Sequence, residues 1–251
     1  MILATGVTVP FKKDADKSID REVALTAAKA SASHNLFETI KMIRMNSRSM
    51  IETLNGENEG VPLKLDALVR NAKITKQKYL SDGTLEITME LSMLGGFAQL
   101  VLPPEIKQLE TIKQVETSGT DSSHSLNGTH ITTEKEKIYT GLIVDTKGLD
   151  VQAAMVPKLL DENGKEVYGP TFVTREFAVQ SGMCGYMTDM DVAQNSDRVG
   201  PHPLVVKGLS TEGPGKSNII IGNADTAKLR GASEHLRFLR ECRVIIVFSR
   251  D

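Results

Sequence analysis

Residues Thr84 to Met93 read TLEITMELSM, and their alternation decides how the first half of the chain folds. Leu, Ile and Met occupy every second position, while Thr, Glu and Ser fill the positions between them. Successive side chains of a strand point to opposite faces of a sheet, so the pattern predicts one buried face and one polar face. Such a strand is typical of an antiparallel sheet that is covered on one side only.

The neighbouring segments supply partners for this strand. KITKQKYL (73–80) precedes it, and Ser81-Asp82-Gly83 lies between the two as a hairpin turn, because glycine tolerates a positive φ. Ile2 to Val9 is a third strand candidate. We therefore expect a small sheet built from a hairpin and an N-terminal strand.

A long helix is predicted between the first strand and the hairpin. Asp20 can cap it, Glu22 suits its positive first turn, and it should end near Met45. The small residues at 27–32 allow it to approach a sheet closely, and a shorter helix is expected in PLKLDALVRNAK (62–73). The apolar positions of the long helix recur close to helical spacing, namely Val23, Ala27, Ala30, Leu36, Phe37, Ile40 and Ile43.

We place these elements in one α+β domain, residues 1–102, with the long helix across the apolar face of the sheet. Pro103-Pro104 ends this domain. Residues 103–138 are rich in Ser, Thr and Gly, and we expect a polar linker or an inserted loop there. A weak helix near Ile106 and a glycosylation pattern, Asn127-Gly-Thr129, fall within this segment, although such triplets often arise by chance.

Residues 139–251 are expected to form a second α+β domain. Asn163-Gly164 stands between KLLDE and KEVY, and this predicts a hairpin because both turn residues tolerate positive φ. PLVVKGLSTEGPGKSNIII (203–221) predicts two strands joined by a Gly-Pro-Gly turn. RVIIVFS (243–249) is typical of a strand buried on both faces. A helix capped by Asn223 lies between them, with an apolar face of Leu229, Ala232, Leu236 and Leu239.

The predicted fold class is α+β, with two small units that are each a mainly antiparallel sheet with helices packed on one face. Leu142 to Val144 adds a short apolar strand to the second unit. The stretch from Arg175 to Pro203 is irregular, with a short helix near Asp189 to Gln194. No internal repeat stands out.

The composition excludes several classes of function. The chain has 251 residues and a net charge of −2, so it lacks the basic excess that neutralises the phosphates of nucleic acids. No run approaches the roughly 18 apolar residues of a membrane span. The N-terminal MILATGVTVPFKK lacks a basic segment followed by a long apolar segment, so we expect no signal peptide in this chain.

One motif suggests phosphate binding. Gly213 to Ser217 read GPGKS, but the position five residues before the Gly-Lys pair is Ser210 rather than glycine, and a strand-like NIII follows instead of a helix. A phosphate loop needs the amides of a following helix N-terminus. A β-turn with a solvated Lys216 is therefore the stronger interpretation.

The other candidates lack partners for catalysis or metal binding. Cys184, in GMCGYM, is a conceivable nucleophile, but no cationic cluster surrounds it and a packing loop is favoured. Cys184 and Cys242 form no CxxC pair, and they are either two free thiols or a disulfide. The acidic Asp189, Asp191 and Asp197 lack the spacing of an EF-hand. No two of the five histidines share metal-ligand spacing: His34, His124, His130, His202 and His235. We predict no catalytic, cofactor-binding or metal-binding residues.

Several segments resemble the LPP-twenty lipoprotein family, which includes the flagellar basal-disc protein FlgP. VRNA (69–72) and YLSDGT (79–84) match motifs of that family, following an alanine-rich helix. YTGLIVDTKGL and FLRECRVIIVFS resemble a C-terminal extension of its longer members. The resemblance implies a periplasmic, outer-membrane-associated or cell-surface location, no known catalytic residues, and assembly into rings or discs.

The hypothesis that follows is a non-catalytic structural or assembly protein of the bacterial cell envelope, with a link to the flagellum. It would associate with itself through sheet edges and the 103–138 segment, and with other envelope or flagellar proteins. A module that binds a small ligand or peptidoglycan is the alternative, and it predicts a concave apolar pocket. The third hypothesis is a hydrolase that uses Cys184 or an unrecognised His-Asp pair.

Overall fold

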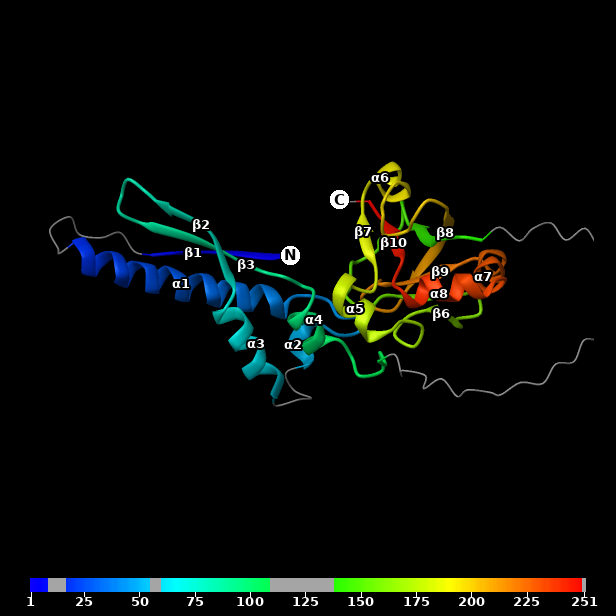
Figure 1. Cartoon of the computed structure of the whole chain (residues 1–251), viewed down its shortest axis with the longest axis horizontal. Coiled ribbons are helices and arrows are strands. Elements are labelled where there is room, and N and C mark those ends of the chain that lie inside the picture. The colour runs from blue at the N-terminus through cyan, green and yellow to red at the C-terminus, as the bar shows by residue number, and fades with distance from the viewer. Residues whose placement is uncertain (9–16, 55–59, 109–137, 250–251) are drawn as a thin grey trace, which may run out of the picture.

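The computed structural model describes residues 1–8, 17–54, 60–108 and 138–249. Figure 1 shows two units side by side, each made of a sheet and helices. The N-terminal unit contains β1 (Ile2–Val7), α1 (Lys17–Lys41), α2 (Ile51–Leu54), α3 (Gly60–Arg70), β2 (Lys73–Tyr79), β3 (Leu85–Leu91) and α4 (Gly96–Val101). The C-terminal unit contains β4 (Gly141–Asp145), β5 (Lys158–Leu160), β6 (Glu166–Tyr168), α5 (Arg175–Ser181), β7 (Gly185–Met187), α6 (Met190–Gln194), β8 (Pro203–Glu212), β9 (Asn218–Ile221), α7 (Asn223–Arg230), α8 (Ser233–Arg240) and β10 (Val244–Val247).

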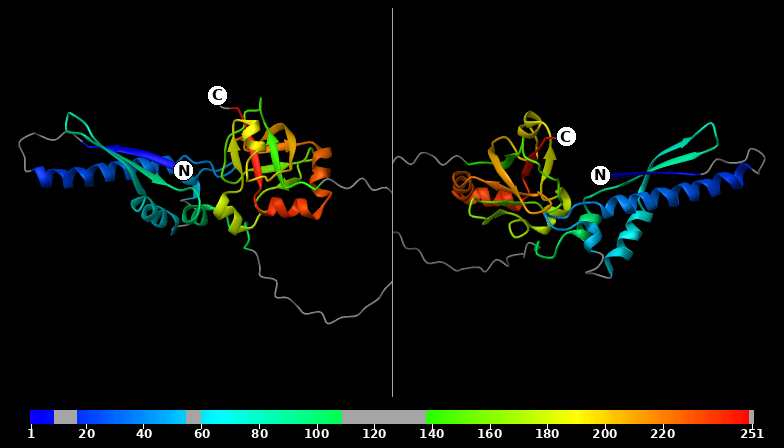
Figure 2. Two further views of the ribbon diagram at one scale, coloured as in Figure 1. Left: turned by 45° about the horizontal axis from the view of Figure 1, so that its top comes forward. Right: turned by 180° about the vertical axis from the view of Figure 1, so that it is seen from behind.

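The first sheet follows the alternation of its central strand. Its order is β1-β3-β2, and both pairings are antiparallel. Leu85, Ile87 and Met89 of β3 are fully buried, as the pattern predicts, and α1 runs along this face in both views of Figure 2. The turn between β2 and β3 has Gly83 at φ 88°, so the predicted hairpin is confirmed.

The long helix is confirmed, but the predicted apolar stripe is wrong by one position along much of its length. The side chains that face the sheet recur every four residues: Ala24, Ala28, Ala32, Leu36 and Ile40. Val23 is 60% exposed. The helix begins at Lys17 and ends at Lys41, so Asp20 is not its cap and Met45 lies beyond it. The smallest side chains face the sheet because β1 approaches the helix backbone closely, and larger apolar residues cannot fit there.

The second sheet has seven strands in the order β6-β5-β9-β8-β4-β10-β7. The α+β class is confirmed, but this sheet departs from the expected mainly antiparallel form, since four of its six pairings are parallel. Parallel neighbours require a crossover, and helices supply several of these connections. Helices also cover both faces: α6 packs against β4, β7 and β10, and α8 lies against β4 within the main core. β10 is consequently buried along its whole length, as predicted.

Other local predictions for the second unit are confirmed in part. The hairpins at Gly164 and at Gly213 form, with φ 76° and 81°. Asp189 caps α6 by accepting a hydrogen bond from the Val192 amide at 2.9 Å. The single helix expected after Asn223 is instead two helices, α7 and α8, and Gly222 holds the N-cap position. Because the helix is interrupted between α7 and α8, a different face of α8 meets the core: His235 and Phe238 are buried, and Leu236 is 44% exposed.

The two units share one continuous hydrophobic core. The loop after α1 bonds to the C-terminal unit through main-chain hydrogen bonds, from Met155 N to Arg44 O (3.0 Å) and from Val156 N to Met45 O (2.8 Å). Residues 103–108 of the predicted linker also approach this unit, and Ile106 is 1% exposed. The rest of that segment, with its histidines and glycosylation pattern, lies outside the described residues.

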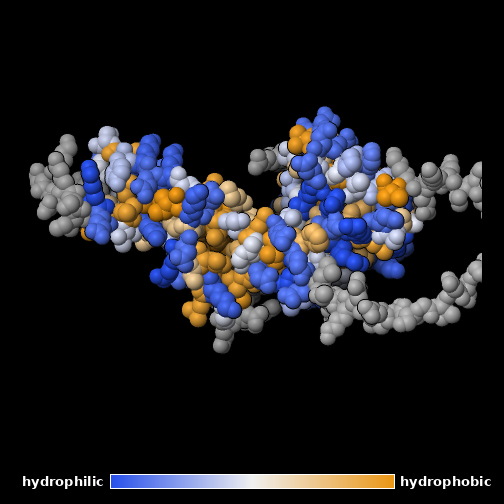
Figure 3. Space-filling view, in the orientation of Figure 1, coloured by the Kyte–Doolittle hydropathy of each residue, from blue (hydrophilic) through white to orange (hydrophobic). Residues whose placement is uncertain are grey.

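Figure 3 shows where apolar residues reach the surface. They gather near the middle of the molecule, over α2, α3 and α4, while the outer parts of both units are mostly hydrophilic. Leu63 of α3 is 76% exposed. None of the helices in the described ranges combines the length and the hydropathy needed to span a lipid bilayer.

Candidate functional site

Both cysteines are free thiols, Cys242 buried and Cys184 partly buried. Burial raises the pKa of the Cys184 thiol to about 12 and that of the Cys242 thiol to about 11. Because the thiolate is the nucleophilic form, both side chains are protonated and unreactive near neutral pH. The disulfide that the sequence allowed does not form.

The described histidines do not approach an acid or a nucleophile in a catalytic arrangement. His235 is buried, with Nδ1 2.8 Å from the Lys228 carbonyl oxygen and Nε2 accepting a hydrogen bond from the Tyr139 amide at 3.1 Å. It thereby ties α7 and α8 to the segment that enters β4. His34 and His202 are exposed.

The phosphate-loop and metal candidates have structural roles. GPGKS is the turn between β8 and β9, with Lys216 at φ 49° and paired with Asp150. A strand follows it, so no helix N-terminus faces the turn. Among the described residues, no group of three or more His, Cys, Asp or Glu side chains could hold a metal ion.

What the structure does present is a three-stranded sheet whose two edge strands, β1 and β2, each pair with β3 alone among the described strands. At the β2 edge, Leu80 N donates to Thr84 O at 2.9 Å, which fixes the alternation of the antiparallel ladder. The main-chain groups of Gln77 and Tyr79 therefore point away from β3. No described strand pairs with them, and six of the seven β2 residues are exposed.

The β1 edge differs in chemistry. Thr8 N donates to Leu85 O at 3.0 Å, so the main-chain groups of Leu3, Thr5 and Val7 point outward by the same alternation. Asn35 of α1 donates to the Thr5 carbonyl at 2.8 Å and covers the middle of this edge. Leu3 and Val7 are 57% and 53% exposed. This edge is apolar, whereas the β2 edge is rich in lysine.

The registers arrange the outer face of the sheet in three rows of side chains. Each row begins with a β1 residue and ends with a lysine of β2: Leu3-Glu90-Lys73, Thr5-Thr88-Lys76 and Val7-Glu86-Lys78. The lysines thus form a stripe along one margin, and the glutamates form a stripe beside it. Lysines on an edge strand are a common protection against uncontrolled pairing.

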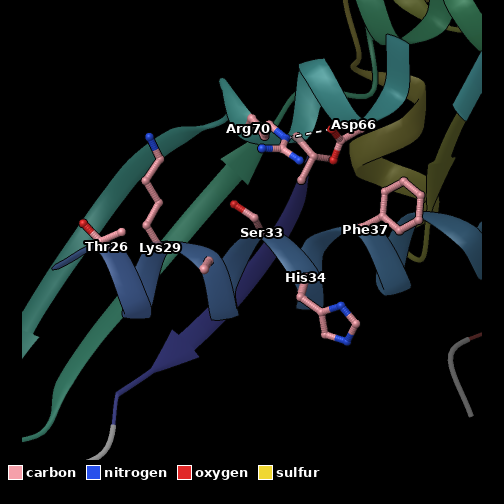
Figure 4. A pocket seen from close by; sticks show the side chains of 9 residues that line it. Thr26, Lys29, Ser33, His34, Phe37, Asp66 and Arg70 are labelled. Atoms are coloured by element: carbon pink, nitrogen blue, oxygen red, sulfur yellow. Dashed lines mark hydrogen bonds and ion pairs between the residues drawn. The ribbon is translucent and has the colours of Figure 1, made fainter. Parts of the chain in front are cut away.

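A groove of about 530 Å³ lies between α1 and α3. Figure 4 shows Lys29 and Ser33 rising from α1 on the same side as the β2–β3 hairpin, while the His34 ring points away. Arg70 and Asp66 of α3 border the groove with an ion pair at 2.7 Å. Because this pair is exposed, it contributes about 1 kcal/mol to stability at most.

A three-stranded sheet is roughly 14 Å wide and a helix is roughly 10 Å wide, so one helix cannot cover all three strands.

Residues 141–250 match a family model described as the second domain of Treponema pallidum Tp0624. The match begins at the first residue of β4 and passes the end of β10, so it spans the seven-stranded sheet. No curated protein matches the chain.

Proposed function

We propose that this protein is a non-catalytic structural or assembly protein of the bacterial cell envelope that associates with itself into a ring, a disc or a filament. The observation that carries the proposal is the three-stranded sheet, whose two edges have no partner strand in the described residues. The resemblance of VRNA and YLSDGT to the LPP-twenty family supports an envelope location and a link to the flagellum. The match to a Treponema pallidum domain agrees with a bacterial source.

The charges of the two edges favour contact between unlike edges. Pairing β2 with β2 of a second copy would bring the lysine stripes together, which like-charge repulsion disfavours. Pairing β2 with β1 of the next copy places the lysine stems against Leu3 and Val7, and apolar stems pack well on such residues. Because this contact joins two different surfaces, it repeats from copy to copy and builds rings or filaments. The segment 109–137, outside the described residues, is a further candidate for strand addition.

Proline variants on the edges test this contact. Leu3→Pro and Gln77→Pro each remove an amide that points away from β3, so each should block one edge and leave the β3 ladder intact. We expect wild type to form large assemblies at high concentration and each variant alone to remain a monomer. Light scattering after size-exclusion chromatography gives the mass, and Leu3→Ala and Gln77→Ala are the matched controls.

Mixing the two variants separates the possible arrangements. Gln77→Pro keeps a usable β1 edge and Leu3→Pro keeps a usable β2 edge, so the mixture should form a dimer and nothing larger. A twofold β1–β1 contact would instead leave Gln77→Pro dimeric by itself. Wild type that stays monomeric at the highest attainable concentration would refute self-association.

A further inference from the structure

A second hollow lies where the two units meet, and we call it the junction pocket. It is enclosed by the loop after α1, the residues after β3, α4, the 152–155 segment and the end of α5. Its volume is about 530 Å³, within the range of small-molecule sites in proteins. Four methionines line it: Met42, Met93, Met155 and Met183. Methionine is flexible and polarizable, so such walls adapt to an apolar guest.

The walls of the junction pocket are already formed. Tyr186 Oη accepts a hydrogen bond from Ala154 N and donates one to Ala154 O, both at 2.9 Å, which holds the 152–155 segment in place. Met155 N bonds to Arg44 O at 3.0 Å, and Gly95 N bonds to Val179 O at 2.9 Å, so main-chain hydrogen bonds between the two units hold the walls together. A ligand would therefore enter without first having to order the walls.

Most of the lining is apolar, and besides Arg44 and Tyr186 it carries the exposed polar side chains of Gln152 and Ser181. The main-chain groups just named bond to one another, and none of the buried side-chain atoms without a hydrogen-bond partner in the described residues belongs to the lining. Among the described lining residues, Arg44 alone carries a charge, and its guanidinium lies against Gly215. At the mouth, Met42 is 66% exposed and Leu94 is 40% exposed.

We propose that the junction pocket binds a single aliphatic chain, of the kind carried by fatty alcohols and by lipid acyl groups. Removal of apolar surface from water at both the ligand and the exposed Met42 and Leu94 supplies the driving force. The proposal is independent of self-association, since no residue of the β1 or β2 edge lines the pocket.

Binding is measured on the full chain with the neutral dye N-phenyl-1-naphthylamine and with 1-dodecanol as competitor, below the concentration at which either aggregates. We expect saturable dye fluorescence that dodecanol displaces. Ala153 is exposed and lines the pocket, so Ala153→Trp should fill it and raise the dissociation constant of the dye at least tenfold. Leu94→Lys should weaken binding about tenfold, because it places a charge at the mouth.

The matched control is Leu236→Lys on α8, which changes a similarly exposed leucine outside the pocket and should leave binding unchanged. Equal melting temperatures of the wild type and the three variants would show that a loss of dye fluorescence is not caused by unfolding. If the protein co-sediments with phosphatidylcholine vesicles and Ala153→Trp abolishes this co-sedimentation, membrane lipid is the source of the aliphatic chain. If the protein binds dodecanol but does not co-sediment with the vesicles, the ligand is a free aliphatic molecule. Absence of saturable binding, or binding that Ala153→Trp leaves unchanged, overturns the proposal.

Discussion

Gly6 shows how one residue sets the distance between the N-terminal helix and its sheet. A Cβ at this position would lie 2.1 Å from Ala32 N and 2.5 Å from Ala28 O, both main-chain atoms of α1. These contacts are far below van der Waals distance, and main-chain atoms cannot rotate away. The alanines on this face of α1 and the glycine in β1 therefore form one close contact.

We predict that Gly6→Ala lowers the free energy of unfolding by about 2 kcal/mol or more, since it forces α1 away from β1. Urea denaturation followed by circular dichroism measures the change. Gly96→Ala is the matched control, because its new methyl would meet only Leu68 Cδ2, at an ordinary 3.8 Å. Equal stabilities of the two variants would contradict the close contact.

Cys184 gives a prediction about pH. Burial raises the pKa of its thiol from near 9 to about 12 in the folded protein, so the folded state keeps its proton while the unfolded state loses it. The contribution to stability is complete below pH 9 and is lost as the pH rises from 9 toward 12. Between pH 9 and pH 12 the free energy of unfolding therefore falls by at most about 1.4 kcal/mol per pH unit because of this thiol.

Other groups also titrate in this range, so the test compares wild type with Cys184→Ala. The difference between their free energies of unfolding should shrink steadily as the pH is raised from 8 to 10.5. A difference that is constant over this range would show that the thiol ionises normally in the folded protein.

At the scale of elements, one side chain links the end of α4 to the start of α5. Arg175 near the start of α5 donates to the carbonyl oxygens of Gln99 (2.8 Å), Leu102 (3.2 Å) and Pro103 (3.0 Å). Gln99 lies in the last turn of α4, and Leu102 and Pro103 follow its end, so a cation is favourable at these carbonyls. The same side chain therefore caps one helix and joins the two units.

We predict that Arg175→Ala lowers the free energy of unfolding by about 2 kcal/mol, because hydrogen bonds from a charged donor are among the stronger ones. Arg175→Lys should recover only part of this loss, since one ammonium cannot reach three carbonyls in the guanidinium geometry. Arg237→Ala, which removes an ion pair from a side chain that is 80% exposed, should cost less than about 0.5 kcal/mol. Urea titration of the three variants would reveal any departure from this order.

At the scale of the whole molecule, the continuous core makes the two units interdependent. Ile106, Val101 and Leu102 belong to the same buried cluster as Val173 and Ala178 of the C-terminal unit. Cutting the chain between the units would expose this surface to water. Interfaces of this kind couple the unfolding of the elements that they join.

We therefore predict a single unfolding transition for the full chain. Far-ultraviolet circular dichroism reports the helices, which are abundant in the N-terminal unit, and tyrosine absorbance reports mainly Tyr139, Tyr168 and Tyr186 of the C-terminal unit. The two signals should change at the same denaturant concentration. Midpoints that differ beyond error would show that the units unfold separately.

The candidate sites differ in how far they could be anticipated. The strand KITKQKYL, with three lysines and few apolar residues, already indicates a solvent-exposed strand, and it forms the open β2 edge. The junction pocket left no local signal, because its methionines come from segments as distant as Met42 and Met183. Periodicity within one segment cannot show which other segment will lie opposite it.

By itself the sequence determined the elements whose pattern is local. The alternation of 84–93, the glycines of the hairpin turns and the apolar run of β10 each act within a few residues, where side-chain period and allowed φ decide the outcome. Only the tertiary structure decided which ridge of α1 faces the sheet, that most pairings of the second sheet are parallel, and that the two units close around a shared pocket. These features depend on the burial of surfaces from distant segments against one another, and that free energy exists only once the chain has brought them together.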